Sequence, residues 1–166
     1  HYLEQTGDYD GAPLLRFYAS CHATVRAKVH LMRELQETDE NRKPVADDAP
    51  YRRYMILAND LLKKRQSALV ITMGLPGSGK TVFANLGAEK LPGICLHSDV
   101  ERKRLFNELS DRYSEQSKYE VYDYLLKTAD TLLQAGMTVI VDASFMKEGN
   151  RTLFHKLAQS RSVPFA

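Results

Sequence analysis

The chain has no tryptophan and only two cysteines in 166 residues. Cys21 and Cys95 lie far apart and form no Cys-x-x-Cys pair, which excludes the common zinc and redox motifs. Two unpaired thiols, which we expect to be buried, are typical of a reducing cytoplasm. The five histidines show no metal-ligand spacing. No Ser/His/Asp arrangement supports hydrolysis by a covalent route.

Long apolar runs are also absent. No segment is long enough to span a bilayer and no secretory signal pattern is present, so we expect no membrane association. The 23 Lys and Arg against 21 Asp and Glu give a formal net charge of +2, which is too small to argue for nucleic acid. Because the first residue is His1 rather than Met, we expect the chain to be part of a longer polypeptide.

Glycine is concentrated in one loop that fits G-x-x-x-x-G-K-[ST], the phosphate-binding loop of P-loop hydrolases and kinases. The glycines let backbone N–H groups turn toward phosphate oxygens, and Lys80 brings a positive charge to the β- and γ-phosphates. The hydroxyl of Thr81 can take one Mg²⁺ position. We therefore predict that ATP and Mg²⁺ bind on Gly74, Leu75, Pro76, Gly77, Ser78, Gly79, Lys80, Thr81 and Val82.

The surroundings of this loop support the prediction. The preceding stretch, 68–73, is apolar and typical of a strand, and residues 82–91 carry apolar side chains at helical spacing. Strand, glycine loop and helix is the order that a P-loop requires, whereas a glycine-rich turn with an ordinary surface lysine requires neither flank.

The pattern of the chain changes near residue 66. Residues 1–66 are predicted to be helical, with one helix from Pro13 to near Gln36 and a second that Asp47 or Asp48 caps. Residues 67–166 alternate strands at 68–73, 94–97 and 138–141 with helices at 82–91, 99–108, 114–135 and 147–161. This order predicts an α/β fold, a three-layer αβα P-loop domain with a parallel, truncated sheet of about three strands.

The last residues, 162–166, resemble the approach to a fourth strand. With three strands, one edge of the P-loop strand would be apolar and unpaired. We therefore expect the native polypeptide to continue beyond Ala166, or another chain to cover this edge, with self-association as one outcome.

Asp99 follows the second predicted strand and is the first candidate for catalysis. Ligands of open parallel sheets lie at the carboxyl ends of the strands, where a carboxylate could accept the proton of an attacking hydroxyl. Arg102 lies on the same helical face and could stabilise charge on the transferring phosphoryl group. The alternative makes Asp99 a helix N-cap and the run Arg102-Lys103-Arg104 a solvated face.

Asp142 ends the third predicted strand, Thr138 to Val141, in the manner of a Walker B motif. Such an aspartate contacts the Mg²⁺ shell or the P-loop hydroxyl beside it, so we predict Thr81 and Asp142 as the metal site. The alternative is a strand-end aspartate that caps the next turn. Ser144 is a possible supporting polar residue.

Read together, Gly74–Thr81, Ser98–Lys103 and Val139–Phe145 resemble the P-loop kinases of the zeta-toxin, chloramphenicol phosphotransferase and polynucleotide kinase type, within the AAA-like predicted kinases. The resemblance covers residues 69–166. It implies that Asp99 is the base that activates an acceptor hydroxyl and that Arg102 binds acceptor or phosphate. Kinases of this class also carry an arginine-bearing lid and a fifth strand, which these 166 residues lack. The resemblance therefore leaves open whether they catalyse turnover by themselves.

Two further resemblances concern the flanks of this site. Leu15–Tyr18 and Thr24–Val29 look like the C-terminal helices of an aminoglycoside-phosphotransferase-like domain, whose catalytic residues would lie upstream of His1; a helical hairpin packing on the kinase explains them equally well. The region 112–119, with Arg112, Tyr113 and Tyr119, lies where small-molecule kinases often bind their acceptor, although ordinary helix packing is the simpler interpretation of Tyr119. Lys147 and Arg151 could reach an anion, although surface charge is the simpler interpretation.

Three functions remain open from the sequence. The leading one is an ATP-dependent kinase, a transferase that acts on a hydroxyl of a small molecule, with Lys80, Asp99 and Arg102 as catalytic residues. The second is a polynucleotide 5′-hydroxyl kinase, which the modest net charge disfavours. The third is a nucleotide-binding module without catalysis.

Overall fold

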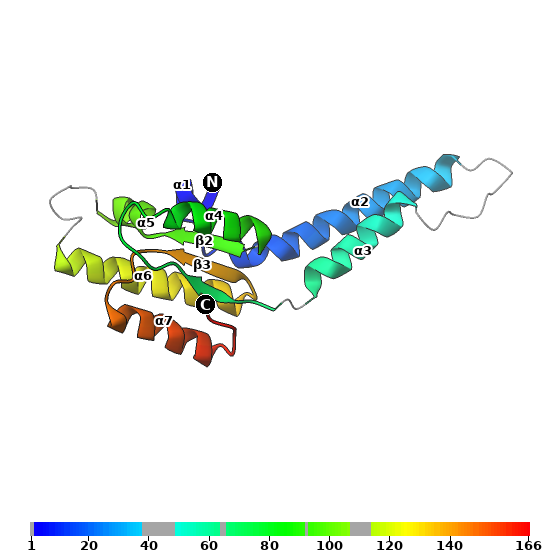
Figure 1. Ribbon diagram of the computed structural model, residues 1–166. Coiled ribbons are helices and arrows are strands. Elements are labelled where there is room, and N and C mark those ends of the chain that lie inside the picture. Colours follow the sequence, from blue (N-terminus) through cyan, green and yellow to red (C-terminus); the bar gives the residue numbers. More distant parts are fainter. Residues whose placement is uncertain (1, 38–48, 64–65, 92, 107–113) are drawn as a thin grey trace. The chain divides into compact units, whose positions relative to one another are not determined.

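The computed structural model describes residues 2–37, 49–63, 66–91, 93–106 and 114–166 (Figure 1). Two compact units result. One comprises residues 1–12 together with 65–166 and contains the sheet, and the other is the helical stretch Pro13–Lys64. Among the described residues, no helix combines the length and the apolar character that crossing a lipid bilayer requires.

The sheet has three parallel strands, β1 (Leu69–Ile71), β2 (Gly93–His97) and β3 (Thr138–Asp142), in the order β1-β3-β2. β3 therefore lies in the centre, with Leu69 opposite Val139 and His97 opposite Asp142. The predicted parallel α/β arrangement is confirmed. Because parallel strands share one direction, the loops that follow all three open at the same edge of the sheet.

The free edge expected beside β1 is paired within the chain. The amide N–H of Leu69 donates to the carbonyl of Pro164 at 2.9 Å, and the amide N–H of Ile71 donates to the carbonyl of Ala166 at 2.8 Å. Leu69 and Phe165 form a parallel bridge. The prediction of an unpaired apolar edge is therefore wrong for β1, and self-association through that edge loses its basis.

Helices cover both faces of the sheet. α4 (Lys80–Lys90) lies on one face and α6 (Glu115–Gln134) and α7 (Glu148–Ser160) lie on the other, while α5 (Ser98–Leu105) follows β2 (Figure 1). The side chain of Ser114 caps α6 by accepting from the amide of Ser117 at 3.0 Å. The core between these layers includes Leu96, Val121, Leu125, Leu132, Val141, Phe145 and Phe154. Leu153 on α7 is 47% exposed.

Residues 2–12 fold with the sheet, although the sequence pattern placed them with the helical segment. They include α1 (Tyr2–Thr6) and lead into a short 3₁₀ helix, Ala12–Leu14. Tyr9 and Ala12 are buried in the core of the sheet unit. The difference arises because burial of a single tyrosine against a distant helix leaves no periodic pattern in the sequence.

The second unit is a hairpin of α2 (Leu15–Glu37) and α3 (Pro50–Leu62). Ser20 Oγ donates to the carbonyl of Ala58 at 3.0 Å across the interface, which small residues such as Ala23 and Ala27 line. Two helices offer each other only one contact surface, so many large apolar side chains of this unit are exposed. They include Leu14, Leu15, Phe17, Tyr18, Val25, Met32, Leu57 and Leu62. The N-cap of α3 is Ala49, and the predicted caps Asp47 and Asp48 lie outside the described residues. Cys21, expected to be buried, is exposed.

Candidate active site

The glycine loop has the backbone geometry that a phosphate cradle needs. Gly77 and Gly79 have φ values of 80° and 83°, a left-handed conformation that L-residues rarely adopt. A Cβ added at either position would meet no atom within 4 Å, so the side of the loop facing away from the protein is open. α4 begins at Lys80 with Gly79 as its N-cap and no side-chain cap. Its first N–H groups and its dipole can therefore accept an anion.

Lys80 lies over this loop. Its Nζ donates to the carbonyl of Leu75 at 2.6 Å and lies 3.4 Å from Ser78 Oγ. The ammonium group of Lys80 is thus held against the glycine loop, where it adds positive charge to the phosphate cradle.

Asp142 is the centre of a hydrogen-bond network beside the loop. It is 6% exposed. Its Oδ2 accepts from Thr81 Oγ1 at 2.7 Å, and its Oδ1 accepts from Thr72 Oγ1 at 3.1 Å. The structure therefore brings together the two residues that the sequence predicts as the metal site, although 61 positions separate them.

A hydroxyl and a carboxylate suit Mg²⁺, which prefers oxygen ligands and keeps several positions for water and substrate phosphates. Among the described residues, no cluster of three or more His, Cys, Asp or Glu side chains forms a metal cage.

His97 is a site residue that the sequence interpretation missed. Its Nδ1 lies 3.0 Å from Asp142 Oδ2 because the two residues pair across β2 and β3. The hydrogen bond to Asp142, followed by that to Cys95, raises the pKa of His97 to about 10 despite burial. Burial would raise the pKa of Asp142, but the hydrogen bonds from His97, Thr81 and Thr72 outweigh it and lower that pKa. A charged His97–Asp142 pair results.

This pair predicts how stability depends on pH. His97 has a folded-state pKa of about 10, above the ordinary histidine value of about 6.5. The stabilisation from its proton is therefore complete below pH ~6.5 and is lost as pH rises through about 10. Urea unfolding of the protein should show a free energy of unfolding that falls across this range.

The His97→Gln variant should lose most of that slope, and the exposed His155→Gln variant on α7 should keep it. An unchanged slope in His97→Gln would contradict the assignment of the charge to this pair.

Asp99 and Arg102 share one face of α5, as the sequence predicts. Arg102 Nη1 lies 2.7 Å from Asp99 Oδ1, and the Asp99 side chain is 80% exposed. The N-cap of α5 is His97 and the helix starts at Ser98. The alternative in which Asp99 is the N-cap is therefore wrong, and its carboxylate is open to solvent at the edge of the sheet where the P-loop opens.

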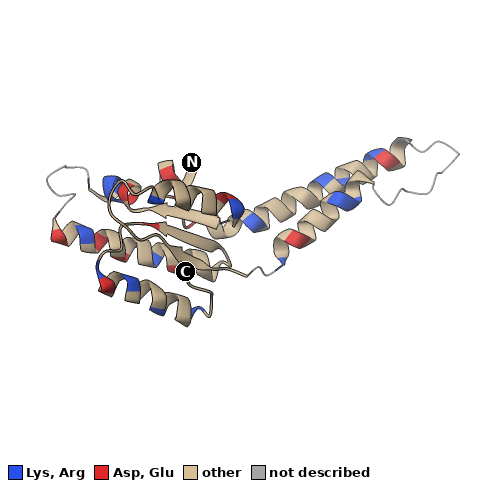
Figure 2. Cartoon of the chain, in the orientation of Figure 1, with Lys and Arg blue, Asp and Glu red and all other residues tan. Residues whose placement is uncertain are grey.

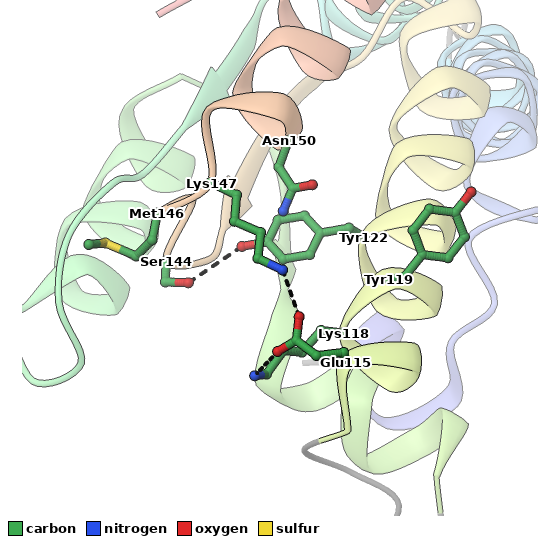
Figure 3. A pocket seen from close by; sticks show the side chains of 8 residues that line it. All are labelled: Glu115, Lys118, Tyr119, Tyr122, Ser144, Met146, Lys147 and Asn150. Carbon is green, nitrogen blue, oxygen red and sulfur yellow. Dashed lines mark hydrogen bonds and ion pairs between the residues drawn. The ribbon is translucent and has the colours of Figure 1, made fainter.

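A cavity of about 400 Å³ lies between the start of α6 and the loop that joins β3 to α7. Figure 3 shows the side chains around it. It adjoins the P-loop through Ser144, which lines it and whose carbonyl accepts from the amide of Gly74 at 3.2 Å. Tyr122 stiffens its floor, since its hydroxyl accepts from the amide of Phe145 at 3.0 Å and lies 3.4 Å from Ser144 Oγ.

Among the described residues that line the cavity, the charged ones are Glu115, Lys118 and Lys147. Glu115 lies 2.7 Å from Lys118 and 2.6 Å from Lys147 (Figure 3). Hydrogen bonds from Lys118 and then Lys147 lower the pKa of Glu115 to about 2. The carboxylate stays ionised at neutral pH, and the group carries one net positive charge.

The weaker candidates from the sequence are now placed. Tyr119 lines the cavity and is 68% exposed, whereas Arg112 and Tyr113 lie outside the described residues. Arg151 Nη1 donates to the carbonyls of Phe145 at 2.7 Å and Met146 at 3.1 Å, so it holds the loop instead of extending toward a ligand.

Comparison with known proteins shows which family the sheet unit matches. Residues 69–166 match the AAA domain family. The "Uncharacterized protein Rv2004c" of Mycobacterium tuberculosis and the "Uncharacterized protein Mb2027c" of Mycobacterium bovis are each 31% identical to the chain over 167 residues. The alignment covers 95% of this chain and 32% of each relative, so the chain spans about a third of their length. It extends over both the hairpin and the sheet unit.

Solved structures agree on the fold. The APS kinase CysC of Mycobacterium tuberculosis has a TM-score of 0.52 and 27% identity, covering 61% of this chain and 73% of that chain. Another structure of that enzyme, in complex with AMPPNP and APS, also has a TM-score of 0.52. A protein from Chloroflexus aurantiacus has a TM-score of 0.53 at 22% identity, over 63% of this chain and 59% of that chain, which shows the fold alone.

Proposed function

This chain belongs to the AAA domain family, and on that premise we propose that it is an ATP-dependent kinase that phosphorylates a hydroxyl of a small molecule. The observation that carries the proposal is the 2.7 Å hydrogen bond from Thr81, at the start of the P-loop helix, to Asp142 at the end of the central strand. A phosphate cradle next to a buried carboxylate suits a metal-bound nucleotide triphosphate. The AMPPNP complex of the similar APS kinase supports ATP as that nucleotide.

Each residue of the proposed site has a distinct role. The N–H groups of the loop and of the first turn of α4 bind the phosphates, and Lys80 stabilises the charge on the transferred group. Thr81 and Asp142 hold Mg²⁺, whose chemistry is to neutralise charge on the phosphate oxygens. Asp99 accepts the proton of the attacking hydroxyl, and Arg102 keeps Asp99 oriented through its 2.7 Å contact.

The acceptor is proposed to bind in the cavity that Ser144 shares with the P-loop. Among the described residues, Asp99 does not line this cavity, so the acceptor would extend from it toward α5. Lys118 and Lys147 outnumber Glu115, and Tyr119 and Tyr122 add ring surfaces. This composition favours a neutral or anionic hydroxyl compound over a polycationic amino sugar.

A polynucleotide 5′-hydroxyl kinase is the second candidate, and the basic run on α5 motivates it. In the structure Arg102 pairs with Asp99 and Arg104 pairs with Glu101, which leaves Lys103 as the exposed member of the run. Figure 2 shows acidic and basic residues interspersed along the helices. A phosphate-backbone groove requires a continuous basic surface, so these contacts weaken this candidate.

Acceptor-dependent ATP consumption tests the proposal. The protein is incubated with Mg²⁺ and ATP against neutral, anionic and cationic hydroxyl compounds and 5′-hydroxyl oligonucleotides. We expect turnover with a neutral or anionic small molecule. Turnover only with oligonucleotides, lost steeply with added salt, would favour the second candidate. ATP binding without consumption under every condition would favour a non-catalytic nucleotide-binding module.

The narrower family assignment to the zeta-toxin and chloramphenicol phosphotransferase type, the relation of the hairpin to aminoglycoside phosphotransferases and the cytoplasmic location stay predictions. The 31% identity of the mycobacterial relatives over the hairpin and the sheet unit supports treating the two as parts of one protein.

A further inference from the structure

The N-terminal segment, residues 2–12, supplies a side chain to the network around Asp142. Glu4 Oε1 lies 3.3 Å from His97 Nε2, and the opposite ring nitrogen of His97 lies 3.0 Å from Asp142 Oδ2. The side chains of His97 and Asp142 are 7% and 8% exposed. A chain of polar contacts therefore runs from Glu4 through His97 and Asp142 to Thr81 at the P-loop.

The segment is anchored independently of the Glu4 carboxylate. The hydroxyl of Tyr9 donates to Glu101 Oε1 at 2.7 Å, and Glu101 is fully buried on α5. Burial, followed by the hydrogen bond to Glu101, raises the pKa of Tyr9, which keeps its hydroxyl a donor. Both groups are satisfied polar atoms in the core, so breaking this contact costs more than a surface hydrogen bond.

Arg104 provides the second anchor. It pairs with Glu101 and donates to the backbone carbonyls of Leu3 and Glu4. Gly7, with φ of 71°, lies against this guanidinium, since a Cβ there would be 2.8 Å from Arg104 Nε. The backbone that carries Glu4 is thus held on both sides, and the position of its carboxylate follows from the fold.

We propose that Glu4 and His97 are positioning residues of the nucleotide site, in which Glu4 holds the imidazole of His97 and His97 holds the carboxylate of Asp142. The inference rests on the proposed function, because it requires Asp142 to act with the Mg²⁺–nucleotide complex. A ring with one hydrogen bond can still rotate about it, whereas partners at both nitrogens fix its plane. Outer contacts of this kind orient a metal-binding carboxylate.

The segment that precedes the helical hairpin is therefore part of the nucleotide site. The hairpin, Pro13–Lys64, is inserted in the sequence between this segment and β1, the strand that leads into the P-loop. In the sequence, the hairpin therefore follows the segment that carries Glu4 and precedes the strand that leads into the P-loop.

The test compares nucleotide affinity with and without the metal. Dissociation constants for ATP are measured by calorimetry in excess Mg²⁺ and in EDTA, for the whole chain and for Glu4→Ala, Glu4→Gln and His97→Gln. Outer contacts of metal ligands contribute about 10–100-fold, so we expect His97→Gln to weaken Mg²⁺·ATP binding about tenfold and the more distant Glu4→Ala about threefold. Affinity for metal-free ATP should stay unchanged in all three, because the cradle itself is intact.

The double variant shows whether Glu4 acts through His97 or whether the two residues affect Mg²⁺·ATP affinity separately. If Glu4 acts through His97, the Glu4→Ala/His97→Gln double variant should bind Mg²⁺·ATP no more weakly than His97→Gln alone. Glu4→Gln keeps an oxygen acceptor for the ring and should lie between Glu4→Ala and the wild type. The matched control is Glu89→Ala, an exposed glutamate near the end of α4, which should change neither constant.

Three results would overturn the inference: equal weakening with and without metal, no change in Glu4→Ala, or full additivity in the double variant. Equal weakening together with a lower melting temperature would assign the residues to stability alone. Absence of Mg²⁺·ATP binding by the wild type would refute the proposed function itself, and the inference with it.

Discussion

Replacing Asp99 by asparagine is expected to lower phosphoryl transfer about 10²–10⁴-fold, the range that general-base catalysis contributes. The amide cannot accept the proton of the acceptor hydroxyl, yet it fills the same space and can still contact Arg102. Because Asp99 is 80% exposed, its loss should leave the fold and the melting temperature unchanged. The dissociation constant for Mg²⁺·ATP should also stay within about twofold of the wild-type value, since the phosphate cradle lies on the glycine loop and α4, whereas Asp99 lies on α5.

The control for this experiment is Asp123→Asn on α6. Asp123 forms an ion pair with Lys127, four residues further along α6. The Asp123→Asn variant therefore loses an ion pair, as Asp99→Asn does, but at a position outside the proposed site. We expect its rate to equal that of the wild type. A rate in Asp99→Asn that matches this control would mean that another group takes the proton.

Replacing Lys80 by alanine is expected to reduce the rate about 10²–10³-fold, as for the loss of one preorganised donor at a developing charge. Lys80 is also expected to contribute to ATP binding, because its ammonium lies over the loop at 2.6 Å from the carbonyl of Leu75. At 100 times the dissociation constant, a ligand stabilises a protein by about 2.7 kcal/mol. The thermal shift that ATP and Mg²⁺ cause in the wild type should therefore largely disappear in Lys80→Ala.

Lys90→Ala, in the last turn of the same helix, is the matched control. It removes one exposed lysine from α4 but lies at the end opposite the cradle. Its thermal shift should equal that of the wild type. An equal shift in Lys80→Ala would place nucleotide binding elsewhere in the chain.

Local sequence patterns were enough to predict those contacts of the candidate site that lie within one segment of the chain. The P-loop is a contiguous motif, and the Asp99–Arg102 pair is set by helical spacing within one element. Asp142 was also predictable, because apolar strands that end in an aspartate are common after a P-loop. In each case the pattern that carries the prediction lies within one short segment: a loop motif, a helical spacing of three residues, or the end of one strand.

His97 could not be assigned in the same way, because its role depends on strand order. It faces Asp142 only because β2 and β3 are neighbours in register, and three predicted strands allow several orders. The observation that His97 and Asp142 each end a strand was available, and with the order β1-β3-β2 it would have sufficed.

The N-terminal segment was harder still. Tyr9 reaches Glu101 across 92 positions, and a segment this short carries no periodicity, so tertiary contacts decide its structure. The final residues were in part predictable, because the stretch 162–166 resembles the approach to a strand and residues 164–166 pair with β1 through three backbone hydrogen bonds. The helices α2 and α3 were predicted from the sequence, but a helical pattern does not say which other element packs against their apolar side chains.

The most direct test of the account is transfer of the γ-phosphoryl group of ATP to a hydroxyl oxygen of an acceptor. γ-Labelled ATP, Mg²⁺ and the acceptor found by the consumption assay are mixed with the wild type and with Asp99→Asn at matched nucleotide occupancy. We predict labelled phosphate ester with the wild type and almost none with the variant. Release of labelled inorganic phosphate alone, or equal ester formation by both proteins, would contradict the assignment of a hydroxyl kinase with Asp99 as its base.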